Sequence, residues 1–101
     1  MNDRDLLELA AKAAEIEVFW HTGWNLLVIQ RTHRAWNPLT DDGDALRLAV
    51  ALDMDVFIRS GGETEAVAPM GKPQTVEHGS DPHSATRRAI VRAAAEIGKG
   101  V

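Results

Sequence analysis

The chain has no cysteine among its 101 residues. Disulfide bonds and thiolate metal sites are therefore excluded, and a reducing cytosol is permitted. No apolar run approaches the ~18 residues that a membrane-spanning helix requires. The acidic N-terminus, "MNDRDLLELA", also lacks the pattern of a signal peptide. We expect a cytoplasmic protein with no membrane partner.

Positive charge is scarce as well. Eleven Lys and Arg residues stand against fifteen Asp and Glu residues, which gives a net charge of −4 and a pI near 5.5. Phosphate binding requires a basic surface, so we expect no nucleic-acid partner, although a local basic patch remains compatible with these totals. The apolar content of 45% is that of an ordinary globular protein, and residues 1–101 suffice for a single domain.

Common catalytic and metal-binding motifs are also absent. No two histidines are spaced four apart as on a zinc-binding helix, and no serine lies in the turn motif of a hydrolase nucleophile. The "SGG" at residues 60–62 resembles a fragment of a phosphate loop, but it fits a hairpin turn better. We therefore predict no cofactor.

The hydrophobic pattern predicts the order α-β-β-α-β-β-β-α. Helices are expected at residues 3–16, about 41–52 and 81–98, where Asp81 and Pro82 form a strong start signal and Gly98 an end signal. The predicted strands lie in "EVFWHTGWNLLVIQR", "MDVFIRS", "TEAVA" and "QTVEHG".

The strand "LLVI" is apolar on both faces, which indicates a sheet covered on both faces. We accordingly predict an α+β protein, a three-layer α/β/α sandwich with a mostly antiparallel sheet. The polar segment "PQTVEH" is expected at a sheet edge. Open edges must be covered or paired, so we also expect a homodimer or a larger homo-oligomer.

An acidic cluster, Asp41, Asp42 and Asp44, lies at the start of the second predicted helix. Clustered carboxylates can bind a divalent cation, but the spacing does not match a calcium loop. The favoured interpretation is structural: Thr40 or Asp41 caps free amides, and the other carboxylates stabilise the positive end of the helix dipole. A metal site at the three aspartates remains the alternative.

The last predicted helix carries three arginines. Arg87 lies at the edge of the apolar stripe that contains Ile90, where an arginine usually packs its stem on the core and finds an acidic or carbonyl partner. Arg88 and Arg92 are expected in solvent, with Arg92 spaced to pair with Glu96. We hypothesise that Arg87 or Arg88 reaches the acidic cluster and ties the two helices together.

Two tryptophans could form part of a binding face, because tryptophan is enriched at interaction hot spots. Trp24 follows a turn glycine, so exposure and core packing are equally compatible with its position; Trp36 fits the core better. The candidate ligand-binding residues are Trp24, Trp36, Asn37, Arg87 and Arg88.

Three blocks of the sequence suggest a family. "LLELAAKAA" at residues 6–14, "WNPLTDDGDALRLAV" at 36–50 and the block at 81–98 that contains "ATRRAIVRAAAEIG" resemble the phage ABA sandwich domain, found in small phage and prophage proteins. Residues 52–80 match no part of that pattern. The resemblance implies an α/β/α sandwich and a phage product acting in the bacterial cytoplasm, but it brings no catalytic residues.

Two functions remain open. The first is a non-enzymatic phage accessory protein that binds a host protein or a small anionic ligand, for example in counter-defence. The alternative is a small metal-dependent hydrolase or nucleotide-processing enzyme that uses the three aspartates.

Overall fold

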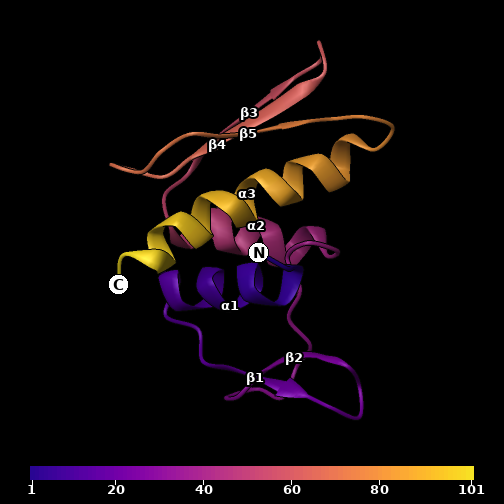
Figure 1. Ribbon diagram of the computed structural model, residues 1–101, viewed down its shortest axis with the longest axis vertical. Coiled ribbons are helices and arrows are strands. Elements are labelled where there is room, and N and C mark those ends of the chain that lie inside the picture. Colours follow the sequence, from indigo (N-terminus) through magenta and orange to yellow (C-terminus); the bar gives the residue numbers. More distant parts are fainter.

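The computed structural model describes all residues from 1 to 101 and contains three helices and two antiparallel sheets (Figure 1). The predicted α+β class, element order and antiparallel pairing are confirmed. None of the three helices has the length and apolar character needed to cross a membrane. The elements are α1 (Asp3–Ala13), β1 (Val18–His21), β2 (Leu26–Ile29), α2 (Asp42–Ala51), β3 (Asp55–Arg59), β4 (Glu63–Val67), β5 (Gln74–Glu77) and α3 (Pro82–Lys99).

The layers come in a different order from the expected α/β/α sandwich. The strands form two separate sheets, β1-β2 and β3-β4-β5, and the helices lie between them (Figure 1). Leu27 of β2 packs into the core, as expected. Val28, on the other face of β2, is flanked by Phe19 of β1 and by Ala35, which forms a bridge to it. Leu27 and Val28 are both buried, so the two faces of "LLVI" are covered as expected, although this strand lies in a two-stranded sheet at one side of the helices.

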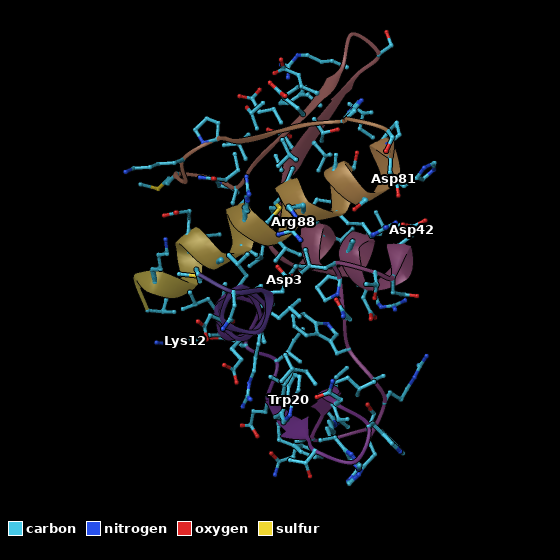
Figure 2. The ribbon with its side chains drawn as sticks, turned by 45° about the vertical axis from the view of Figure 1, so that its right-hand side comes forward. Asp3, Lys12, Trp20, Asp42, Asp81 and Arg88 are labelled. Atoms are coloured by element: carbon cyan, nitrogen blue, oxygen red, sulfur yellow. The ribbon has the colours of Figure 1, made fainter.

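The β1-β2 hairpin is attached to α1 through its inner face. Val18, Trp20 and Ile29 are partly buried against the core, and the guanidinium of Arg4 lies 4.4 Å from the centre of the Trp20 ring. Figure 2 shows Trp20 on the hairpin, below the helices. The hairpin tip carries Trp24, which is 59% exposed.

Helix α3 occupies the centre of the molecule. It packs against α1 and α2 and also against β4 and β5. The predicted start is confirmed, because Asp81 Oδ1 accepts a hydrogen bond from Ser84 N at 3.1 Å and Pro82 begins the helix. Ile90 is buried, as its place in the apolar stripe predicts. The buried surface is wider than one stripe, however, because the sheet covers a second side of the helix.

Hydrogen bonds also connect the three-stranded sheet to α3. Thr64 of β4 is fully buried, and its Oγ1 lies 2.8 Å from Thr86 Oγ1 of α3 and 2.7 Å from His78 Nε2. A buried hydroxyl needs such partners, because an unsatisfied one would cost free energy. The contact between sheet and helix is thus polar as well as apolar at this point.

Helices α1 and α3 run side by side in the same direction and touch through small residues (Figure 1). Ala10 and Ala11 of α1 and Ala94 of α3 are buried. A Cβ atom added at Gly98 would collide with the backbone carbonyl of Leu9. The sequence suggested that Gly98 ends the helix, but α3 continues to Lys99. The glycine is needed instead for the close contact with α1.

We expect Gly98→Ala to destabilise the protein, although alanine is the better helix former. The new methyl group would meet backbone, which cannot rotate away, so the overpacking should cost about 1–3 kcal/mol. Gly100→Ala is the matched control, since its Cβ would lie at an ordinary 3.6 Å from Ile97 O. Urea unfolding of both variants provides the measurement. A Gly98→Ala protein as stable as the wild type would contradict the close contact.

Candidate functional site

The acidic cluster is the start of α2. Asp41 is the N-cap, and its Oδ2 accepts a hydrogen bond from Asp44 N at 2.8 Å. Asp44 Oδ2 accepts from Asn37 N at 2.9 Å, and Asp44 Oδ1 accepts from Arg47 Nη2 at 2.7 Å. Two of the three carboxylates thus hold the turn that leads into the helix, as the structural interpretation predicts.

The third carboxylate binds Arg87. Arg87 Nη1 donates to Asp42 Oδ1 at 2.6 Å, and Arg87 Nε donates to the carbonyl oxygen of Leu39 at 2.8 Å. The predicted link between the last helix and the acidic cluster is therefore confirmed. The arginine side chain is only 16% exposed, whereas Asp42 is 70% exposed, so the bond to Leu39 is the better protected of the two.

Arg88 differs from the expected solvent position. Its guanidinium crosses to α1 and donates to both carboxylate oxygens of Asp3, at 3.2 and 3.4 Å (Figure 2). The expected Arg92–Glu96 pair does not form; Glu96 instead accepts from Lys99 Nζ at 3.1 Å. The side of α3 that carries Arg88 was expected to face solvent, but α1 packs against it.

The five candidate ligand-binding residues do not meet at one site. Trp36 is buried in the core, and the side chain of Asn37 accepts a hydrogen bond from Leu39 N at 2.9 Å. Trp24 stacks on His21 at the distant hairpin tip, with ring centres 4.2 Å apart. Arg87 and Arg88 are both neutralised by aspartates of this chain. These residues therefore form no open site for an anion.

The aspartates likewise form no cation cage. Each of Asp41, Asp42 and Asp44 already accepts a hydrogen bond from a backbone amide or a guanidinium. No group of three or more histidine or acidic side chains is arranged to hold a metal ion. The geometry of the cluster thus favours its structural interpretation over the metal site.

The surface offers instead an apolar groove of about 390 Å³ between α2, β3 and the first turns of α3. The Arg87–Asp42 ion pair lies at its margin, where α3 meets the start of α2. The apolar lining side chains are Ala45, Leu46, Ala49, Val56, Ile58 and Ile90.

Large apolar side chains are exposed around this groove. Leu46 of α2 and Ile58 of β3 line the groove and are 65% and 64% exposed. Val50 and Phe57 of the same two elements are also exposed but do not line it. Such gatherings on a protein surface mark binding sites. The apolar residues of α2 span more of its circumference than one core-facing stripe needs, and this excess was the signal in the sequence that the prediction missed.

The groove is bordered by an open strand edge. β3 pairs only with β4, so half of its backbone amides and carbonyls have no partner in the sheet. β5 occupies the other edge of this sheet, as predicted for "PQTVEH". The two edges differ in character, because β5 is polar whereas β3 exposes Phe57 and Ile58.

A comparison of the chain with protein-family models, with curated proteins and with solved structures finds no match. The candidate site therefore stands on its own geometry, an apolar groove beside an unpaired strand edge.

Arg87→Met should cost about 1.5–3 kcal/mol of stability, because it removes a charge-assisted hydrogen bond to a partly buried carbonyl. Asp42→Asn should cost less than about 1 kcal/mol, since that carboxylate is well solvated. Chemical denaturation would measure both, with Arg92→Met as the control, because Arg92 is an exposed arginine that forms no ion pair. Equal losses for the Arg87 and Arg92 variants would show that Arg87 does not clamp the two helices.

Proposed function

We propose that this chain is a non-enzymatic protein-binding module. It captures an extended segment of a partner protein along β3 and buries alternate apolar side chains of that segment in the groove. The observation that carries the proposal is the exposure of Leu46 and Ile58 on either side of an apolar groove next to an open strand edge. Strand addition supplies affinity through main-chain hydrogen bonds and specificity through the side chains that enter a pocket.

A protein segment fits this groove better than a small anion. The nearest guanidinium, that of Arg87, is already bound to Asp42 and to Leu39 O. The exposed Asp42 carboxylate at the margin would repel an anionic ligand. Apolar side chains on an added strand, by contrast, would cover surface that Leu46 and Ile58 now present to water.

The metal-dependent enzyme has less support. The three aspartates that it would use are engaged in capping, in a turn and in the clamp to α3. Clustered carboxylates that already hold backbone amides and arginines are poorly placed to bind a cation as well.

The biological setting we propose is that of a phage or prophage accessory protein in the cytoplasm of a bacterial host, with a host protein as partner. It rests on the resemblance of three sequence blocks to the phage ABA sandwich domain. Two of these blocks, residues 36–50 and 81–98, contribute α2 and the α3 side of the groove. The blocks that carry the resemblance thus line most of the groove, whereas the strand edge of β3 lies in the unmatched residues 52–80.

The proposal predicts that selection from a random peptide library will enrich peptides with alternating apolar residues. Fluorescence anisotropy with a labelled selected peptide would then compare the wild type with Leu46→Asp. We expect binding to the variant to be at least about tenfold weaker, because a carboxylate would replace the apolar wall of the groove.

Met70→Asp is the matched control, since Met70 is an exposed apolar residue that does not line the groove. Its peptide affinity should equal that of the wild type. If no peptide is enriched, or if both variants bind as the wild type does, the groove is not a protein-binding site.

A further inference from the structure

The sequence of β3 is complementary to itself. It reads Asp55-Val56-Phe57-Ile58-Arg59, with an acidic residue at one end, a basic residue at the other and three apolar residues between. If two copies of β3 pair antiparallel about Phe57, Asp55 of each copy faces Arg59 of the second copy, and Val56 faces Ile58. Directly opposite residues of opposite charge stabilise an antiparallel pair, and like charges destabilise it.

We infer that the chain forms a two-fold symmetric dimer by pairing β3 with β3 of a second copy, which joins two three-stranded sheets into one of six strands. This inference rests on the proposed function, because it assigns a partner to the same strand edge and groove. A two-fold interface requires a surface that complements itself, and the charge order of β3 meets that requirement.

The partners of the two charged residues within one chain support this assignment. Asp55 forms no ion pair in its own copy and is exposed. Arg59 lies on the outer face of the sheet, with Nη2 3.1 Å from Glu65 Oε1 and Nη1 3.9 Å from Glu63 Oε2, and its side chain remains about half exposed. Only the Glu65 contact is a hydrogen bond, and a guanidinium has five N–H donors, so donors remain for a further carboxylate. Pairing of β3 with a second copy would give the unpartnered Asp55 such a donor.

The alternation of side chains along β3 also places Val56 and Ile58 where the dimer would cover them. Val56 is opposite Ala66 and Ile58 is opposite Thr64, and both β4 residues are fully buried toward the helices. Val56 and Ile58 therefore point to the helix side of the sheet, into the groove. In the dimer the grooves of the two copies would meet across the new strand pair and cover apolar surface that is otherwise exposed.

The competing edge offers no such match. β5 reads Gln74-Thr75-Val76-Glu77, and pairing two copies antiparallel would place no residue of opposite charge against Glu77. The β3-β4 hairpin lies at the outer end of the molecule, beyond α3, where a second copy can approach it (Figure 1). An exposed apolar edge that is not paired would also promote aggregation.

Sedimentation velocity at high micromolar concentration can test the dimer with two charge-reversal variants. In Asp55→Arg every cross-strand pair is arginine with arginine, and in Arg59→Asp every pair is aspartate with aspartate. Each variant alone should dimerise at least about tenfold more weakly than the wild type. An equimolar mixture of the two restores opposite charges at both positions, so it should recover the dimer.

Glu77→Arg, a charge reversal on β5, is the control and should dimerise as the wild type does. Circular dichroism of each variant checks that the fold is retained, and recovery in the mixture also excludes misfolding as the cause of the loss. A monomeric wild type, single variants that dimerise normally, or a mixture that stays monomeric would each overturn the inference.

The dimer test and the peptide-selection test can give different outcomes, so failure of the dimer can be told apart from failure of the proposed function. A monomeric chain that binds selected peptides retains the proposed function and overturns the dimer. If the variant mixture recovers the dimer but the chain selects no peptide, the dimer is retained and the proposed capture of other proteins is overturned. If both hold, selected peptides should dissociate the dimer, because they compete for one strand edge.

Discussion

The contact between α1 and α3 is the constraint on which the rest of the structure depends. Gly98 and a set of alanines remove the side-chain bulk that would separate the two helices, so the backbone of α3 lies directly against Leu9. The distance between packed helices is set by the side chains at their contact. With α3 held in the centre, α2 and the three-stranded sheet pack on its remaining sides, and the Arg88–Asp3 pair adds a polar contact between the same two helices.

Arg87 connects that central helix to the acidic cluster and to the candidate binding surface. Its guanidinium holds both Asp42 at the start of α2 and the carbonyl of Leu39 before it. Because Arg87 and Asp42 also stand at the margin of the groove, the clamp positions one wall of the proposed site. The acidic residues are thus part of the framework that supports the proposed site.

The exposed apolar side chains of α2 and β3 do not take part in the packing of the core. Burial of Leu48 and Ala49 accounts for the packing of α2 on the rest of the protein, yet Leu46 and Val50 stay in water. Exposed apolar side chains add nothing to the stability of an isolated chain and expose it to aggregation. Their concentration around one groove and one strand edge is explained if that surface is covered by a partner.

By itself, the sequence determined the features that depend on neighbouring residues. These are the element order, the cap at Asp81, a cap by Thr40 or Asp41 at the start of α2, and the position of Arg87 at the edge of an apolar stripe, from which a link between Arg87 or Arg88 and the acidic cluster was predicted. Tertiary structure decided the rest. The pattern of β2 shows that both faces are covered, but it does not show what covers them, and Gly98 resembles a helix end until α1 is placed against it. The groove combines three segments that are distant in the chain, so no local pattern contains it; only the packing of α2, β3 and α3 brings Leu46, Ile58 and Ile90 together.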